Sequence, residues 1–357
     1  MNDKNLKYIN LMAKSVKDSE LVPELYKPSS FWAHWVDKLS TDMNTFGFNH
    51  FKETASCHAL FVAHYGYPFN EISDDLKNDF IDFAQNKQLS KKQVDFLELY
   101  LSGKMNAISD YRVLCAADDG PSCGLDFSKF SEGNIGSPQE QFDFDGQLHS
   151  RHSLNYLHQL SFLKKCMGDF SPKTYMEIGG GWGSLGEVLL KSCTLDIKYI
   201  DIDIPPSCII AEYYLKETFP SEKVYGYSES KAEDNIVIKN LPRLTVIPSW
   251  KIEKLQGQID VFINSISFQE MEPVIVQSYL KTVARLKPKF ILLRNLREGK
   301  NIEPDSGNGS HVIEPVERGF YINCLIQQGY QLYAENVIPF GRKTIDGFHS
   351  EILVFSI

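Results

Sequence analysis

The sequence EIGGGWGSLG at residues 177–186 decides the fold, because it joins three kinds of local structure in one short stretch. An apolar run ends in the carboxylate of Glu177, a glycine turn follows, and an amphipathic segment begins at Ser184. Glycine permits positive φ in a tight turn and lets a ligand approach the backbone where no Cβ intervenes. The free N–H groups at the start of a helix suit an anionic group. The stretch therefore predicts a strand, a cofactor-binding turn and a helix.

Two cofactor motifs overlap in this turn. Counted from Gly181, the pattern Gly-x-Gly-x-x-Gly is a dinucleotide fingerprint, and Asp201 and Asp203 follow about 20 residues later, where an acid binds ribose. Counted from Glu177, the pattern Glu-x-Gly-x-Gly-x-Gly is motif I of S-adenosylmethionine-dependent methyltransferases. Dinucleotide folds normally keep an apolar residue at the position of Glu177. This acid therefore favours S-adenosylmethionine, with a nicotinamide dinucleotide as the alternative.

The composition is that of an ordinary globular protein. The chain has 357 residues, of which 43% are apolar, enough for two domains with substantial cores. Its formal net charge of −9, without a long basic cluster, argues against binding to nucleic acid or to an anionic membrane surface. A polar N-terminus and the lack of a long apolar run predict a cytoplasmic protein without an integral membrane segment.

The apolar pattern divides the chain in two. Residues 6–111 repeat apolar side chains at helical spacing, and residues 118–146 are rich in Gly, Asp, Ser and Pro. We therefore expect residues 1–149 to form a helical region that ends in a Gly/Pro-rich lid segment. Residues 150–357 are expected to form the methyltransferase domain.

Strand and helix patterns alternate through this second part. The apolar runs predict seven strands, at residues 174–178, 197–202, 244–247, 259–264, 290–294, 331–337 and 351–357. Helices are predicted at residues 150–167, 208–219, 274–286 and 315–328. The alternation predicts a doubly wound, mostly parallel α/β sheet of seven strands. The last two strands have no helix between them, which predicts an antiparallel hairpin at the sheet edge, as in methyltransferases.

The cofactor-binding residues are expected where the strands end, because a doubly wound sheet binds its ligand at that edge. Asp203 stands where the second strand must end, and we expect it to accept hydrogen bonds from both ribose hydroxyls. Trp250 follows the third strand and can either stack on the adenine or fill core. The predicted cofactor-binding residues are Glu177, Gly179, Gly181, Gly183, Asp203, Ser249, Trp250 and Asn264.

Two titratable residues are candidates for the base that removes a hydroxyl proton during methyl transfer. Glu270 lies in the polar loop after the fourth strand, and His311 lies in the segment after the fifth strand. Substrate contacts are predicted for His149, Arg151, His152, Gln269 and Asn295. The acids Asp201, Asp203, Glu270 and Glu272 have the chemistry of Mg²⁺ ligands, but they form two distant pairs, so no metal site is predicted.

Several of these segments resemble one family. The runs EIGGGWGSLGEVLL from Glu177, YIDIDIPPSCIIAEYYL from Tyr199 and FINSISFQEM from Phe262 are similar to the sugar O-methyltransferases encoded with bacterial surface-polysaccharide genes. The resemblance extends to KPSSFW at residues 27–32 and GNIGSP at residues 133–138, and so to most of the chain.

The resemblance implies S-adenosylmethionine as methyl donor, a Rossmann-like methyltransferase fold, and a sugar, nucleotide sugar or glycan as acceptor in capsule or O-antigen biosynthesis. Two positions depart from the family pattern: Trp182 stands where a tyrosine is usual, and Leu296 separates Asn295 from Arg297, which puts a site role of Arg297 in doubt. The alternatives are an NAD(P)-dependent sugar-modifying oxidoreductase and a catalytically silent methyltransferase-like binding protein. A homo-oligomer is compatible with the sequence.

Overall fold

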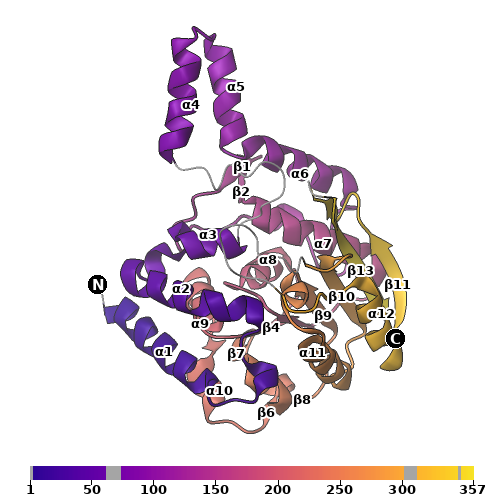
Figure 1. Cartoon of the computed structure of the whole chain (residues 1–357). Coiled ribbons are helices and arrows are strands. Elements are labelled where there is room, and N and C mark those ends of the chain that lie inside the picture. Colours follow the sequence, from indigo (N-terminus) through magenta and orange to yellow (C-terminus); the bar gives the residue numbers. More distant parts are fainter. Residues whose placement is uncertain (1–2, 62–73, 301–311, 345–346) are drawn as a thin grey trace.

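A twisted sheet with helices on both faces forms the centre of the molecule (Figure 1). The computed structural model describes residues 3–61, 74–300, 312–344 and 347–357. In spatial order the strands are β11 (Gln331–Asn336), β13 (His349–Ser356), β10 (Phe290–Leu296), β9 (Val261–Ser265), β3 (Thr174–Ile178), β4 (Lys198–Asp203), β7 (Leu244–Pro248) and β5 (Val224–Tyr225). The short strand β12 (Arg342–Lys343) pairs with β13.

The direction of the strands identifies the fold class. Strands β10, β9, β3, β4, β7 and β5 run parallel, whereas β13 is antiparallel to both β10 and β11. This order, with the last strand inserted next to the fifth predicted one, is that of the Rossmann-like methyltransferase sheet. The predicted doubly wound sheet of seven main strands is confirmed, and β5 and β12 add short strands to it.

The predicted terminal hairpin forms, but its second strand is not at the edge. Strand β13 lies between β10 and β11, so β11 is the strand of this hairpin that lies at the sheet edge. The burial patterns give the physical reason. Six successive residues of β13 are buried, as in a strand covered on both faces, whereas β11 alternates between exposed and partly exposed residues.

Helices make up most of the N-terminal part, as predicted: α1 (Asp3–Ser19), α2 (Ser30–Phe46), α3 (Ala55–Phe61), α4 (Asp74–Asn86), α5 (Lys91–Leu101) and α6 (Lys104–Ala117). The helices that follow are α7 (Arg151–Met167), α8 (Ser184–Ser192), α9 (Ser207–Thr218), α10 (Tyr227–Lys231), α11 (Pro273–Arg285) and α12 (Arg318–Gln327). None of the helices in the ranges given above combines the length and the apolarity needed to cross a bilayer.

Short elements connect the main ones. The 3₁₀ turns are η1 (Glu24–Tyr26), η2 (Phe48–Glu53), η4 (Phe127–Lys129), η5 (Ile238–Asn240), η6 (Ser249–Lys254) and η7 (Ser267–Glu270). A two-stranded pair, β6 (Ile236–Val237) and β8 (Leu255–Gln256), stands apart from the main sheet. The predicted Gly/Pro-rich segment contains a hairpin, β1 (Phe142–Phe144) and β2 (Gln147–His149), whose turn places Asp145 and Gly146 at positive φ.

The N-terminal helices share a hydrophobic core with the sheet helices. Tyr8 of α1 packs edge-on against Tyr213 of α9, with ring centroids 5.1 Å apart. Residues of α1, α2 and η2 belong to the same buried cluster as residues of α7, α8 and α9. This packing holds the segment around α2 beside the carboxyl ends of the strands, where it contributes to the candidate site.

Candidate active site

The loop between β3 and α8 has the backbone conformation that its glycines predict. Gly179, Gly181 and Gly183 all have positive φ, at 77°, 62° and 86°. The N–H of Gly179 donates to the carbonyl of Ile202 at 2.8 Å, which ties the loop to β4. A side chain at Gly179 would overlap Ser267 from the loop after β9. The loop therefore fits closely between two neighbouring strand ends.

Asp203 holds the same loop from the end of β4. Its Oδ2 accepts a hydrogen bond from the N–H of Gly181 at 2.9 Å, and its Oδ1 accepts one from the N–H of Ile204 at 2.7 Å. Burial raises the pKa of this carboxyl group to about 7, although the two N–H donors act in the opposite direction. Asp203 thus holds the loop in place, and its carboxyl group has a pKa close to neutral pH.

A cavity of about 490 Å³ opens at the carboxyl ends of β3, β4, β7 and β9. This is the position where a doubly wound sheet binds its ligand. The lining residues are Lys27, Ser29, Trp32, Ile178, Gly179, Gly181, Ile202, Asp203, Ile204, Ser249, Ser267, Met271, Ile275 and Tyr279. We call this space the donor cavity. Of the predicted cofactor-binding residues, it brings together two glycines of the loop, Asp203 and Ser249.

The N-terminal segment closes one wall of the donor cavity through contacts with the loop after β9. Ser29 donates from Oγ to the backbone carbonyl of Glu270 at 2.6 Å, and the indole N–H of Trp32 donates to the Glu270 carboxylate at 3.2 Å. The N–H and hydroxyl of Ser30 donate to Glu272 at 3.1 and 2.5 Å. Sequence reasoning missed this wall. The signal that the sequence offers for it is the resemblance at residues 27–32.

Glu270, a predicted catalytic residue, lies next to this wall. Besides the indole of Trp32, its carboxylate contacts Lys300, with Nζ and Oε1 2.9 Å apart. Its side chain is 12% exposed. A largely buried carboxylate with one cationic partner and one neutral donor is held in a defined orientation. The other predicted catalytic residue, His311, lies outside the described residues.

Asn264, Asn295 and Gln269 form one buried polar network. Asn264 donates from Nδ2 to the carbonyl of Ile178 at 3.0 Å, and it accepts from Nδ2 of Asn295 at 3.1 Å. Asn295 in turn accepts from the backbone N–H of Gln269 at 3.1 Å, and Gln269 accepts from the N–H of Leu296 at 2.7 Å. The network fixes the loops after β9 and β10 against the end of β3.

Glu177 lies beneath the glycine loop and is fully buried. Its carboxyl group accepts hydrogen bonds from the hydroxyls of Tyr199 at 2.6 Å and Tyr156 at 3.3 Å. Burial raises its pKa to about 8. Its register partner on β4 is Asp201, whose pKa burial also raises well above the usual value. Glu177 is not among the residues that line the donor cavity.

The two residues after β7 have different positions. Ser249 lines the donor cavity and donates from Oγ to the carbonyl of Tyr26 at 2.7 Å, which attaches η1 to the strand end. Trp250 is partly buried and packs against both hydrophobic clusters of the protein, and it does not line the cavity. The stacking of Trp250 on an adenine therefore stays a prediction.

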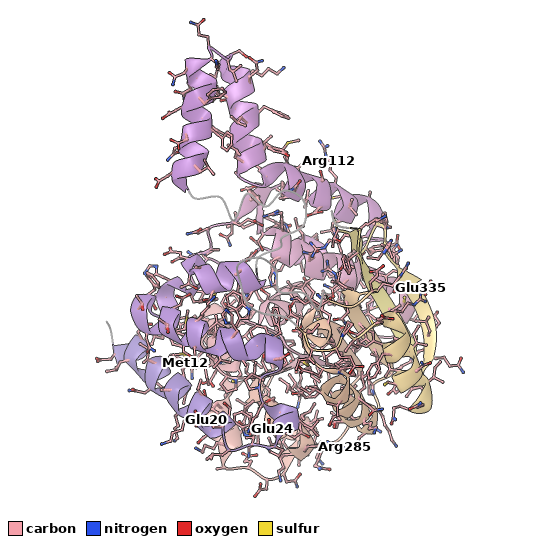
Figure 2. All side chains as sticks on the ribbon, viewed as in Figure 1. Met12, Glu20, Glu24, Arg112, Arg285 and Glu335 are labelled. Carbon is pink, nitrogen blue, oxygen red and sulfur yellow. The ribbon has the colours of Figure 1, made fainter. Side chains whose placement is uncertain are left out.

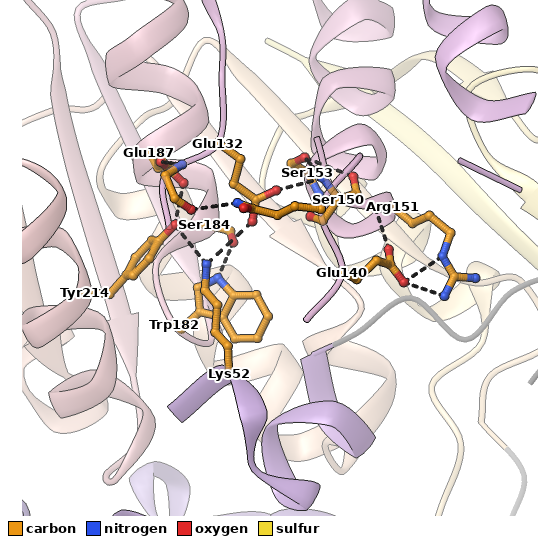
Figure 3. Close-up of polar contacts among 12 residues, drawn as sticks. Lys52, Glu132, Glu140, Ser150, Arg151, Ser153, Trp182, Ser184, Glu187 and Tyr214 are labelled. Carbon is orange, nitrogen blue, oxygen red and sulfur yellow. Dashed lines mark hydrogen bonds and ion pairs between the residues drawn. The ribbon is translucent and has the colours of Figure 1, made fainter. Parts of the chain in front are cut away.

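A second cavity, of about 320 Å³, lies across the glycine loop from the first. Two consecutive residues of the loop line the two cavities: Gly181 lines the donor cavity, and Trp182 lines the second one. Its other lining residues are Lys52, Glu132, Pro138, Gln139, Glu140, Ser150 and His152. Figure 3 shows polar contacts of Lys52, Glu132, Glu140, Ser150 and Trp182. Most of these residues come from η2 and the predicted lid segment.

A buried ion pair stands in the wall of the second cavity. Nζ of Lys52 lies 3.5 Å from Oε1 of Glu132, and both side chains are 3% exposed (Figure 3). Lys52 also donates to the hydroxyl of Tyr214 at 3.2 Å, and Glu132 accepts from the N–H of Ser150 at 2.8 Å. A buried pair of this kind adds little net stability, but removing one partner leaves the other charge buried and uncompensated.

The three predicted substrate residues between the end of β2 and the first turn of α7 have different surroundings. His152 lines the second cavity with its ring 4.9 Å from that of Trp182, and burial lowers its pKa to about 3. Arg151 binds Glu140 through Nε and Nη2, at 2.9 and 2.6 Å, and so orients a cavity residue. His149 is buried among aromatic rings, and burial lowers its pKa to about 4. Both imidazoles are neutral at physiological pH.

A metal site has no support in the part of the chain that the structure describes. Within those ranges, no three His, Cys, Asp or Glu side chains are grouped so that they could hold an ion.

No protein-family model and no curated protein matches the chain. Solved structures similar to it include a SAM-dependent methyltransferase from Aquifex aeolicus, at 13% identity over 58% of this chain and 94% of that chain, with a TM-score of 0.37. Magnesium protoporphyrin IX methyltransferase from Synechocystis PCC 6803 with bound SAM matches at 12% identity over 58% and 85%, with a TM-score of 0.36. The N-terminal domain of EvdMO1, crystallised in the presence of SAH and D-fucose, matches at 13% identity over 60% and 89%, with a TM-score of 0.37. At such low scores, the fold assignment rests on the strand order of this chain.

Proposed function

We propose that the chain is an S-adenosylmethionine-dependent O-methyltransferase that methylates a sugar hydroxyl, in the biosynthesis of a bacterial surface polysaccharide such as a capsule or O-antigen. The observation that carries the proposal is the donor cavity, where the backbone of Gly179 and Gly181 and the carboxylate of Asp203 face one space. The antiparallel β13 between β10 and β11 favours this reading over a nicotinamide dinucleotide domain, whose sheet is built from two parallel βαβαβ halves.

The residues of the donor cavity have the chemistry that this cofactor needs. Each oxygen of Asp203 already accepts one backbone N–H and keeps a lone pair for a ribose hydroxyl. Ser249 and Ile204 line the side where we propose the adenine. The first turn of α8, which begins at Ser184, suits the carboxylate of the methionine moiety. Glu177, Gly183 and Asn264 support the loop from behind in this proposal.

The bound cofactor supplies a methyl group on a sulfonium sulfur. The protein aligns the acceptor hydroxyl in line with that group, keeps water out and accepts the hydroxyl proton. We propose Glu270 as the base, because its carboxylate contacts Trp32, a residue that lines the donor cavity, and is oriented by that indole and by Lys300. His311 remains a second candidate from the sequence.

We propose that the acceptor sugar binds in the second cavity. The ring of Trp182 offers an apolar face to the C–H side of a sugar, and Gln139 and Glu140 offer hydrogen-bond acceptors to its hydroxyls. His152 is neutral and can exchange a hydrogen bond with a hydroxyl. Arg151 acts through Glu140 as a positioning residue.

The donor is tested by identifying what copurifies with the protein. Ligand released by denaturation is analysed by mass spectrometry, and S-adenosylmethionine or S-adenosylhomocysteine is expected. A bound nicotinamide dinucleotide would overturn the proposal. Calorimetric titration with S-adenosylmethionine gives the affinity if nothing copurifies, and absence of binding would also overturn it.

The transfer step is tested with S-adenosylmethionine that carries a radiolabelled methyl group. The acceptors are a pool of bacterial nucleotide sugars and glycans. Glu270→Gln is expected to lower turnover at least tenfold with cofactor affinity retained, whereas the exposed control Glu20→Gln should change neither. Trp182→Ala is expected to raise the acceptor KM. Cofactor binding without transfer to any pool member would instead support the silent binding protein.

A further inference from the structure

Helices α4 and α5 form an arm that projects from the rest of the molecule (Figure 1). Among the described residues, α4 packs mainly against α5, and α5 continues into α6 at the base of the arm. The turn between residues 86 and 91 forms the tip. Side chains stand out into open space around both helices (Figure 2). We call this unit the arm, residues 74–101.

The arm exposes large aromatic side chains to solvent. Phe80 and Phe83 lie three residues apart on one face of α4, with 46% and 61% of their surface exposed, and Phe96 of α5 is 59% exposed. The helices have only 13 and 11 residues. Isolated helices shorter than about 12–15 residues are marginal in water and depend on packing of their apolar faces. The arm therefore has the properties of an element that is completed by a partner.

The charges of the arm are distributed unevenly along its length, although one lysine, Lys77, lies among the acids of the first half of α4. Lys87, Lys91 and Lys92 gather at the tip, where α4 ends and α5 begins. Asp75 and Asp79 lie toward the base, in the first half of α4, and both are exposed. A second arm laid antiparallel to the first would bring each basic tip beside an acidic base. One arm thus carries both the basic and the acidic group of the proposed contact, as an interface with two-fold symmetry requires.

We propose that two copies of this chain form a two-fold dimer in which the arms pair antiparallel, tip against base, as a four-helix bundle. Pairing buries the exposed phenylalanines of both copies and sets opposite charges against each other. The acidic base argues against an anionic membrane as the occupant. The dimer is independent of the reaction proposed above, because no arm residue lines either cavity.

The first test is the mass of the full-length protein in solution, measured by size-exclusion chromatography with light scattering at micromolar concentration. The expected mass is twice the 40.7 kDa of one chain. The double variant Phe80→Glu/Phe96→Glu should run as a monomer, with its dimer dissociation constant raised about tenfold or more. Phe46→Glu changes a residue of similar exposure outside the arm, 58%, and should leave the dimer intact. Circular dichroism checks that each variant is folded.

A charge exchange tests the antiparallel arrangement itself. In a dimer of Lys91→Glu/Lys92→Glu, negative charges at the tip face negative charges at the foot of the partner's arm. In a dimer of Asp75→Lys/Asp79→Lys, positive charges face positive charges. Each variant alone should dissociate more readily than the wild type at low ionic strength, and an equal mixture should form the mixed dimer, in which both contacts are again complementary. A monomeric wild type, a dimer insensitive to the phenylalanine changes, or a mixture that forms no mixed dimer would overturn the proposal.

Discussion

The carboxylate of Asp203 accepts a hydrogen bond from the backbone N–H of Gly181 at 2.9 Å, which joins the end of β4 to the glycine loop after β3. The same carboxylate lines the donor cavity. One side chain therefore shapes the loop and faces the proposed ligand. This dual position explains why the group is buried and why its pKa is raised to about 7.

Binding of S-adenosylmethionine is expected to depend on the ionisation of Asp203. The charged carboxylate is the stronger acceptor for ribose hydroxyls, so affinity should rise as the pH increases through about 7. Asp203→Asn should weaken binding about tenfold and flatten this pH dependence. Calorimetric titration at several pH values measures both effects. The exposed Asp234→Asn serves as control, and an unchanged pH profile in Asp203→Asn would contradict the assignment.

Gly179→Ala should abolish cofactor binding while the protein stays folded. The new Cβ overlaps Ser267, and the positive φ of 77° adds strain, so the loop must move. Gly146→Ala has the same kind of strain, at φ 81°, but no neighbour within 4 Å of the new Cβ. Comparing the two by cofactor titration and thermal unfolding separates crowding from strain. Equal cofactor affinity in both variants would show that the close fit at Gly179 is unimportant.

Glu177→Gln should stabilise the protein in a pH-dependent manner. The pKa of Glu177 is raised from 4.5 to about 8, so the folded protein keeps a proton that the unfolded chain releases, and this group lowers stability as the pH rises through that window. Glutamine cannot ionise. Its amide oxygen can accept from one of the two hydroxyls, Tyr199 or Tyr156, and its amide NH2 can donate to the oxygen of the other. We expect a gain in unfolding free energy on the order of 4 kcal/mol at pH 8, shrinking to nothing below pH 4.5.

Thermal or urea unfolding across this pH range measures the effect of Glu177→Gln. The exposed Glu20→Gln should show no comparable trend. A variant that is less stable than the wild type at high pH would mean that Glu177 is charged and usefully paired in the folded state.

Lys52→Met should destabilise the protein by about 3–5 kcal/mol, because it leaves the carboxylate of Glu132 buried without its cation. The double variant Lys52→Met/Glu132→Gln removes both charges and should recover much of that loss. Urea unfolding of the two single variants and the double variant forms a complete cycle. Strictly additive losses would show that the two charges do not interact.

The elements that the sequence predicted best are those with a strong local pattern. The strand at residues 174–178 has the predicted bounds, and the other predicted strands agree to within two residues at every end. The positions of Asp203 and the glycines at the strand ends could be predicted because strand, turn and helix follow one another directly in the chain. The hairpin of β1 and β2 was missed because its strands have only three residues, too few for an alternating pattern.

The sequence by itself determined the doubly wound sheet, the glycine loop and the carboxylate at the end of β4, because each depends on neighbours a few positions away. Only the tertiary structure decided what surrounds them. Ser29 and Trp32 reach Glu270 across about 240 positions, and Lys52 meets Glu132 inside a cavity wall. No periodicity along the chain encodes such contacts, since they arise when separate elements bury a common apolar surface and their polar groups must then find partners.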